Sequence, residues 1–311
     1  MLATAVTPIA SPDFARDLDL STEELLQVLD LASDVKSAPR DFRQMLAGRS
    51  AGLLFEKPSF RTRLTFELAM KQLGGHVVSS EGPIAGREPL KDIARNLERW
   101  VDVIVARTFE QSTVDELAKW AHVPVVNALS DLFHPCQALA DMQTLREHFG
   151  VDLKGLKLTF IGDGNNVAHS LMLSAVRLGV EFAIASPFGY GPSAAIVSQA
   201  EALAAVSGSK VLVTNDPCEA LEGAQAVYTD VWASMGQEDE AAERRGAFKP
   251  YQVNDELLSH APGALFMHCL PAKRGQEVTD EVMESPRSIA FDQAENRLHA
   301  QKSLLLTLLA G

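Results

Sequence analysis

Two arginines and two hydroxyl side chains lie within five consecutive residues, Ser59 to Arg63. Ser59 can cap the helix that follows, and a helix start presents free backbone N–H groups and a partial positive charge. Because arginine binds phosphate oxygens through two parallel hydrogen bonds, this segment can hold a phosphate group. A solvated helix start with no ligand is the simpler interpretation. The GxxxxGK[ST] pattern is missing, which argues against a nucleotide triphosphate loop.

Other polar groups follow predicted strands. In open parallel sheets, ligands bind beyond the carboxyl ends of the strands, so residues at those ends are the first candidates for a site. Each of them alone can equally be structural. The candidates are Arg107, the loop from Asp163 to Asn166, Asp230, and the pair His268 and Cys269.

The turn Gly162-Asp163-Gly164 resembles the beginning of a dinucleotide-binding fingerprint. The pattern then fails, because Val167 replaces the third glycine and the next strand ends at Ser186 instead of an acidic residue. A tight turn is the structural alternative. Asn165 and Asn166 can offer amide donors to a carboxylate instead.

Cys269 directly follows His268, and neighbouring residues of an extended segment point to opposite sides. The two therefore do not form a simple nucleophile and base pair, and the thiol either positions a ligand or is an inert buried cysteine. His134 is either a loop histidine with satisfied hydrogen bonds or a donor to a developing oxyanion.

Helical patterns alternate with short apolar runs along the chain, which predicts an α/β fold with two doubly wound parallel-sheet domains linked by helices. Thr113 and Glu116 are spaced as a capping box. Helices are predicted over residues 59–73, 89–99, 135–149 and 295–309. Strands are predicted over 101–105, 123–126, 156–161, 181–185, 210–214, 226–229 and 264–267. The first domain is predicted to contain residues 1–146 and 293–311, and the second residues 147–292.

The composition restricts the class of protein. The chain has 311 residues, 46% of them hydrophobic, and a net charge of -13, which repels nucleic acid and anionic membranes. An odd number of cysteines, three, without CxxC spacing argues against a disulfide framework or a zinc site and favours a reducing compartment. Neither a secretion signal nor an apolar run of membrane-spanning length is recognised. We therefore expect a cytoplasmic enzyme.

Four segments, spread in order over nearly the whole chain, carry a recognisable motif each. They are residues 55–63 (FEKPSFRTR), 133–141 (FHPCQALAD), 230–238 (DVWASMGQE) and 268–271 (HCLP). Together they resemble the aspartate/ornithine carbamoyltransferase family. The Ser-Met-Gly element of the third segment and the fourth segment, with residues 162–169 and 295–302, resemble its ornithine branch.

The resemblance implies that carbamoyl phosphate binds first. Its phosphate meets Ser59, the Phe60 backbone, Arg61, Thr62 and Arg107, and its carbonyl oxygen meets Thr62, Arg107, His134 and Arg297. Its nitrogen faces Gln137 and the Leu270 carbonyl, with Cys269 nearby. A cis bond is common before the proline here numbered Pro271.

The resemblance further implies that ornithine binds through Asn166, Asp230, Ser234 and Met235. Its δ-amine lies beside Cys269. The expected products are citrulline and phosphate, in arginine biosynthesis, without metal or organic cofactor. The catalytic residues are then Arg107, His134, Cys269 and Arg297, and the family forms trimers with active sites between subunits.

Three positions depart from the family pattern. No glutamine occurs from Ser79 to Glu88, although ornithine enzymes usually have one there that reaches a neighbouring subunit. Phe60 replaces a threonine, methionine or leucine, and Lys273 replaces a common histidine.

Two alternatives stay open. The acceptor amine can be aspartate or an N-acylated ornithine, with Arg87 or Lys91 as a cation for the aspartate side chain. The chain can also be a regulatory binding protein on the same fold, although the complete set of carbamoyl phosphate residues weakens that interpretation.

Overall fold

A computed structural model describes residues 6–84, 86, 88–233 and 238–309. The chain divides into two compact units. Unit 1 contains Met1–Gln143 and Glu295–Gly311, and unit 2 contains Thr144–Ala294. Both boundaries fall inside helices, α5 (Pro135–Phe149) and α12 (Ala290–Leu309).

Unit 1 contains a parallel sheet with the strand order β2-β1-β3-β4. The chain runs from β1 outward to β2 and then crosses to β3 on the other side, so the order reverses between β1 and β3. Phe55 and Arg107 are register partners at the carboxyl ends of these two strands. The strands are β1 (Ser50–Phe55), β2 (His76–Glu81), β3 (Val103–Arg107) and β4 (Val125–Leu129).

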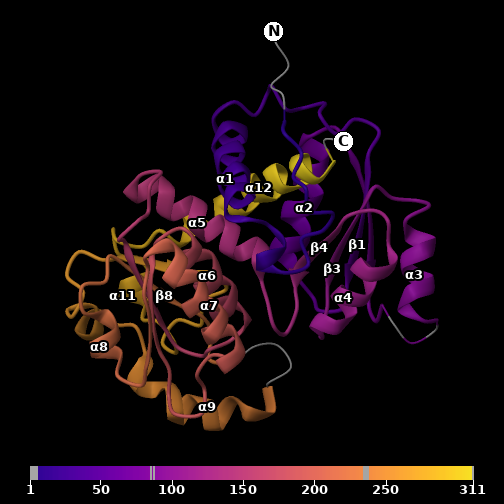
Figure 1. The fold of residues 1–311 in the computed structure, drawn as a ribbon. Helices are drawn as coiled ribbons and strands as arrows, with labels where there is room; N and C mark the ends of the chain where they lie inside the picture. Colours follow the sequence, from indigo (N-terminus) through magenta and orange to yellow (C-terminus); the bar gives the residue numbers. More distant parts are fainter. Residues whose placement is uncertain (1–5, 85, 87, 234–237, 310–311) are drawn as a thin grey trace. The chain divides into compact units, whose positions relative to one another are not determined.

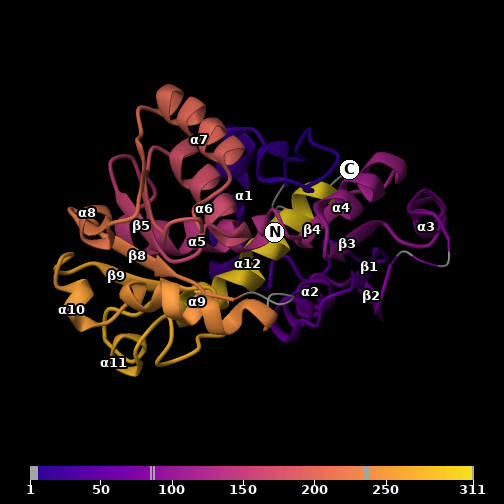
Figure 2. The ribbon, with the colours of Figure 1, turned by 90° about the horizontal axis from the view of Figure 1, so that it is seen from below.

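Helices cover both faces of this sheet, and Figure 2 shows α4 and α2 on opposite sides of β3 and β1. Ile104 and Ala106 of β3 alternate with Val103 and Val105, and the first pair packs in a buried cluster with α3 and α4. The helices of unit 1 besides α12 and the start of α5 are α1 (Thr22–Ser37), α2 (Phe60–Gln72), α3 (Leu90–Leu97) and α4 (Gln111–Trp120), with a short 3-10 turn at Asp17–Asp19.

Unit 2 contains a parallel sheet with the order β7-β6-β5-β8-β9. The chain enters at the central strand β5, builds β6 and β7 on one side and then crosses to β8 and β9. The order therefore reverses between β5 and β8. The strands are β5 (Lys157–Ile161), β6 (Glu181–Ala185), β7 (Val211–Thr214), β8 (Ala226–Thr229) and β9 (Leu265–His268).

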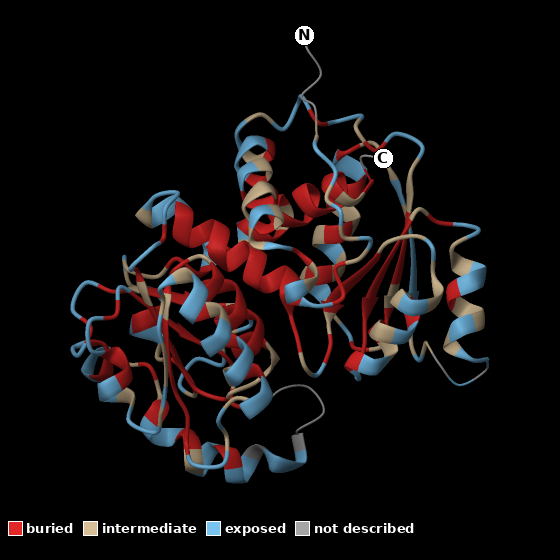
Figure 3. Ribbon diagram, in the orientation of Figure 1, coloured by how far each residue is buried: buried red, intermediate tan, exposed pale blue. Residues whose placement is uncertain are grey.

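Helices α6 and α7, labelled in Figure 1, cover one face of this sheet, and α10 and α11 cover the other (Figure 2). In each unit the central strands are buried almost throughout, whereas the edge strands β2 and β7 are partly or largely exposed. The helices are buried on their inward sides (Figure 3). The helices are α6 (Asn166–Arg177), α7 (Ala194–Ser207), α8 (Pro217–Leu221), α9 (Ala241–Phe248), α10 (Asp255–Leu258) and α11 (Asp280–Met283), with 3-10 turns at Glu238–Glu240 and Lys249–Tyr251.

The two predicted parallel-sheet units are confirmed, and helix α5 has the predicted bounds. The predicted capping box at Thr113 and Glu116 is wrong, because α4 begins at Gln111 and both residues lie inside it. The Gln111 N–H donates over 2.7 Å to Oδ1 of Asp131, a residue 20 positions away. A long-range carboxylate therefore caps this helix in place of a local side chain.

Helix α12 begins at Ala290, five residues before the predicted start. Among the described residues, no helix combines the length and the apolar character needed to cross a membrane.

Candidate active site

The predicted anion site begins where β1 ends and α2 starts. Ser59 has an extended backbone and caps α2, since its side chain accepts a hydrogen bond from the Thr62 N–H over 3.3 Å. Phe60, the first helical residue, has a 77% exposed side chain. A ligand at this helix start would therefore meet the Phe60 backbone, and the aromatic ring is not needed for binding.

Arg63, the second arginine of this segment, has carboxylate partners within the protein. Arg63 forms ion pairs with Glu81 of β2 and with Glu67 one turn further along α2. These carboxylates neutralise Arg63 and hold it at the edge of the sheet. Arg63 is thus a poor candidate for a substrate phosphate.

Arg297 of α12 connects two other predicted residues. Its Nη1 donates to Oε1 of Gln137 over 2.6 Å, and its Nη2 donates to Oγ1 of Thr62 over 3.0 Å. Gln137 in turn donates to Asp141 over 2.7 Å, which fixes the orientation of its amide. All four side chains are buried. A guanidinium, a hydroxyl and an amide therefore converge beside the start of α2.

Arg107 and His134 are buried beside this network. Burial, together with the charges of Arg297 and Arg107, lowers the pKa of His134 well below its usual 6.5. The imidazole is therefore neutral near pH 7 and can donate one hydrogen bond without adding charge. Burial and the charge of Arg107 also lower the pKa of the neighbouring Lys57. In both groups burial is the larger cause, and the neighbouring guanidinium charges add to it.

Glu56 orders the loops around Arg107, a role that the sequence analysis missed. Its backbone N–H donates to the Arg107 carbonyl over 2.9 Å. Its two carboxylate oxygens accept from the N–H groups of Ile84, at 3.1 Å, and Phe109, at 3.0 Å. The loops after three adjacent strands are therefore joined at one side chain. Its position directly after a strand is the only sequence signal for this role.

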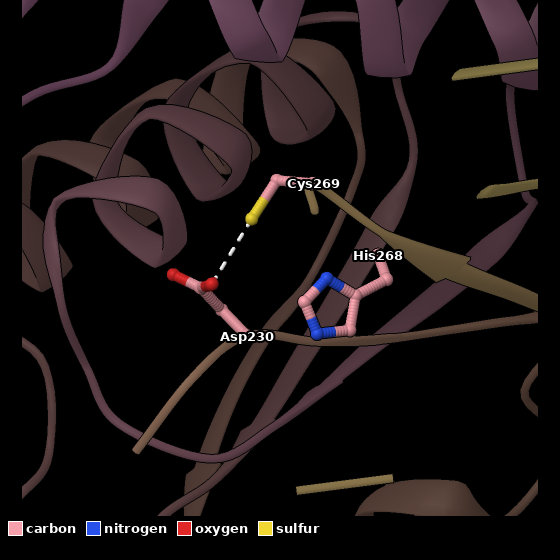
Figure 4. A group of neighbouring side chains, drawn as sticks. All are labelled: Asp230, His268 and Cys269. Carbon is pink, nitrogen blue, oxygen red and sulfur yellow. Dashed lines mark hydrogen bonds between the residues drawn. The ribbon is translucent and has the colours of Figure 1, made fainter. Parts of the chain in front are cut away.

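Unit 2 brings three polar residues together where its strand order reverses. Nδ2 of Asn165, after β5, donates to Oδ2 of Asp230, after β8, over 2.9 Å. Sγ of Cys269, after β9, donates to Oδ1 of Asp230 over 3.0 Å (Figure 4). Asn165 also caps α6 by accepting from two backbone N–H groups. Asn166 is the first residue of that helix and partly buried.

Figure 4 shows His268 beside Asp230 and Cys269, and the ligand atoms of the three side chains lie within 4.8 Å of one another. Both ring nitrogens of His268 already have protein partners, the Leu270 N–H at 2.9 Å and Glu277 at 3.2 Å. A metal ion could recruit this histidine only by breaking one of these bonds. Asp230 and Cys269 alone are fewer ligands than a structural zinc site uses.

A second feature missed by the sequence analysis is the buried ion pair between Asp163 and Arg244, which measures 2.9 Å. Arg244 also donates to the Trp232 carbonyl over 3.0 Å and to Glu240 over 2.9 Å. Burial raises the pKa of Asp163 to about 6, and the Arg244 charge opposes that rise. Arg244 therefore ties α9 to the turn that carries Asn165. The i,i+4 spacing of Glu240 and Arg244 signals only a surface pair, since the sequence does not show that Arg244 is buried against Asp163.

The remaining predicted residues divide between the units. Ser234 and Met235 lie outside the described residues. Cys269 and Leu270, expected to contact carbamoyl phosphate, belong to unit 2. Leu270 has a left-handed backbone with φ 58°, and the bond between Leu270 and Pro271 is cis.

Each unit thus places polar side chains at the carboxyl ends of the strands that flank its reversal of strand order. That is the usual position of a small-molecule site in an open parallel sheet. The molecule is of the class of two-domain α/β enzymes, with a capped helix start beside buried arginines in one unit and a buried carboxylate in the other.

Comparison with known protein families identifies the family within this class. Residues 13–147 match the carbamoyl-P binding domain, and residues 154–308 the Asp/Orn binding domain, of aspartate/ornithine carbamoyltransferase. The chain belongs to the aspartate/ornithine carbamoyltransferase family.

Relatives resemble the chain over nearly its whole length. The ornithine carbamoyltransferase of Rhodococcus opacus is 51% identical over 302 residues, 96% of each chain. The solved ornithine carbamoyltransferase of Pyrococcus furiosus is 47% identical, with a TM-score of 0.95 and coverage of 98% of this chain and 99% of that one. A solved N-acetyl-L-ornithine transcarbamylase is 32% identical, with a TM-score of 0.86 and coverage of 95% and 99%.

Proposed function

We propose that this protein transfers the carbamoyl group of carbamoyl phosphate to the δ-amine of L-ornithine, giving L-citrulline and phosphate. The observation that carries the proposal is the double contact of Arg297 with Thr62 and Gln137. It joins α12, α2 and α5 around the capped helix start. The high identity to proteins named ornithine carbamoyltransferase supports the same reaction.

We assign carbamoyl phosphate to the residues around the start of α2, in a domain of residues 1–146 and 293–311. The phosphate would be bound by Ser59, the Phe60 N–H, Arg61, Thr62 and Arg107. The helix start and two guanidiniums give this place the positive potential that a dianion requires. Its carbonyl oxygen would meet Thr62, Arg107, His134 and Arg297, and its nitrogen would meet Gln137, Cys269 and the Leu270 carbonyl.

We assign ornithine to residues 147–292, with its α-amino group near Asp230 and its carboxylate near Asn166. Asp230 is a buried carboxylate, which favours a cationic group and disfavours the extra carboxylate of aspartate. An N-acylated ornithine lacks that positive charge. The roles of Ser234 and Met235 rest on the sequence motif alone.

The chemistry follows from these assignments. The δ-amine, with a pKa near that of lysine, about 10.4, must lose a proton before its nitrogen attacks the carbonyl carbon. Attack forms the C–N bond and a tetrahedral oxyanion, which Arg107, His134 and Arg297 can stabilise. The C–O bond to phosphate then breaks, the carbonyl re-forms, and the leaving phosphate can take the proton that the attacking nitrogen must still lose. Because phosphate is already a good leaving group, the transfer needs no metal or organic cofactor.

The test is turnover with carbamoyl phosphate and each amine in turn, measured as phosphate release and as carbamoylated product. Citrulline formation from ornithine, with at least about a hundredfold lower kcat/KM for aspartate and N-acetyl-ornithine, is expected. Preference for either of the other amines would overturn the acceptor assignment. Binding of carbamoyl phosphate without any turnover would instead favour a regulatory binding protein.

We further propose a homotrimer, or a multiple of trimers, in the cytoplasm, acting in arginine biosynthesis. Strand β2 supports assembly, because it lies at the sheet edge and most of its residues are exposed, Val78 at 67%. Three cysteines without disulfides fit a reducing compartment. One relative, at 47% identity, is named as anabolic. Light scattering of purified protein at three times the chain mass, or a multiple of it, is the expected result.

A further inference from the structure

Glu277 lies outside the expected substrate contacts and is completely buried in unit 2. Its backbone is fixed independently, because its carbonyl accepts from the Val253 N–H over 2.8 Å and its neighbour Val278 pairs with Val253. A carboxylate buried in this way is unfavourable unless its hydrogen bonds stabilise it.

Oε1 of Glu277 takes two contacts. It lies 3.2 Å from Nε2 of His268, which is also fully buried, and it accepts from the Lys273 N–H over 2.5 Å. His268 ends β9, and Lys273 follows the cis proline bond. The segment between them, Cys269 to Ala272, is thus held at its two ends by one carboxylate oxygen.

The backbone settles the tautomer of His268. A backbone N–H can only donate, so Nδ1 of His268, at 2.9 Å from the Leu270 N–H, must be the acceptor nitrogen. Nε2 then carries the proton and donates to Glu277. The carboxylate therefore orients the imidazole, and the imidazole holds the Leu270 N–H.

The hydrogen bond from the Leu270 N–H to His268 stabilises an unfavourable backbone conformation. Leu270 is the only non-glycine residue with a positive φ in the described part of the chain, at 58°, a conformation that costs of order 1 kcal/mol for an L-residue. Cys269, directly before it, places Sγ 3.0 Å from Asp230. A change in the Leu270 backbone would move that sulfur.

We propose that Glu277 is a positioning residue, which acts through His268 and the Lys273 N–H to fix the Cys269 thiol against Asp230. Its connection to catalysis rests on the transfer reaction proposed above. Its effect on the position of the Cys269 thiol does not depend on that reaction, so the positioning role and the transfer reaction can be disproved separately.

The experiment compares Glu277→Gln, which keeps an acceptor oxygen, with Glu277→Leu, which removes it. Both are made in a Cys218→Ser background, because Cys218 is exposed while Cys136 is buried. Thr159→Val is the matched control, since it removes another buried hydrogen bond of unit 2, to the Ala220 carbonyl, away from the loop. Three quantities are measured: the iodoacetamide alkylation rate of Cys269, kcat with ornithine, and Tm.

We expect Glu277→Leu to raise the alkylation rate of Cys269 about fivefold or more and to lower kcat about tenfold or more. Glu277→Gln should keep the alkylation rate and kcat within about threefold of the parent. Thr159→Val should lower Tm without changing the alkylation rate or kcat. If Glu277→Leu does not fold, His268→Gln is used in its place with the same expected result. The glutamine amide can still donate to Glu277, whereas the Leu270 N–H loses its acceptor.

The proposal is overturned if Glu277→Leu leaves the alkylation rate of Cys269 unchanged. It is also overturned if Thr159→Val lowers kcat as much as Glu277→Leu does while the two variants have the same Tm. If the parent makes no citrulline, the transfer reaction is wrong, and the alkylation rates still decide whether Glu277 positions the thiol.

Discussion

Arg297 and Gln137, separated by 160 residues in the chain, are joined by a hydrogen bond of 2.6 Å from Nη1 to Oε1. The same guanidinium reaches Thr62 with its other terminal nitrogen. Two contacts in different directions need the planar fork of arginine, which lysine does not have.

Arg297→Lys should therefore lower kcat/KM for carbamoyl phosphate about a hundredfold while leaving the fold intact. Steady-state kinetics and Tm are the measurements. Arg49→Lys is the control, because Arg49 forms a partly exposed ion pair with Asp102 in the same unit. Equal kinetic losses in both variants would show that Arg297 has no special role.

Arg61→Ala and Arg63→Ala form a matched pair on one helical turn. The sequence motif assigns the phosphate to Arg61, so the Arg61 variant should lose carbamoyl phosphate affinity by about 2 kcal/mol. Arg63 is held by Glu81 and Glu67, so its variant should bind carbamoyl phosphate as the parent does. Isothermal titration with carbamoyl phosphate alone measures this. Similar affinity in the two variants contradicts the assignment of the phosphate to Arg61.

His134 should make stability depend on pH. Its folded-state pKa lies well below 6.5, so below pH 6.5 the unfolded chain takes up a proton that the folded chain does not. The free energy of unfolding of the parent should fall relative to that of His134→Gln, by up to about 1.4 kcal/mol per pH unit. Denaturant unfolding at pH 7.5 and 5.5 gives both values, and a constant difference rejects the explanation.

Arg244→Met should destabilise the protein by about 3 kcal/mol near pH 8, because it leaves the Asp163 carboxylate buried without its cation. The loss should shrink as pH falls from 8 toward 6 and level off below 6, since Asp163 takes up its proton above pH 6 without Arg244 and at about 6 with it. Urea unfolding across pH 5 to 8 measures the trend. Asp163→Asn in the same chain should recover part of the loss, and a loss independent of pH would assign the effect to packing.

Gly164→Ala tests the turn that carries Asn165. A Cβ at this position would lie 2.1 Å from the Pro192 backbone nitrogen, whereas one at Gly191 would meet nothing within 4 Å. Gly164→Ala should destabilise by about 3 kcal/mol and raise KM for ornithine, while Gly191→Ala should do neither. Equal Tm values for the two variants would contradict this close approach.

Much of the fold was predictable, because apolar periodicity and helix signals are local. Helix α5 begins at Pro135 and ends before Gly150, as the residue types predict. The start of α4 was not predictable, because Asp131, from a distant loop, caps it. The early start of α12 likewise depends on buried contacts that sequence patterns do not report.

The sequence by itself determined the parallel α/β class and which polar residues follow strands, since parallel strands place their carboxyl ends at one edge. Only the tertiary structure decided the partners: Arg63 with Glu81, Arg244 with Asp163, and Arg297 with Thr62 across 235 residues. The physical reason is that burial and long-range contact set the charge and orientation of these side chains. Local residue types cannot encode either.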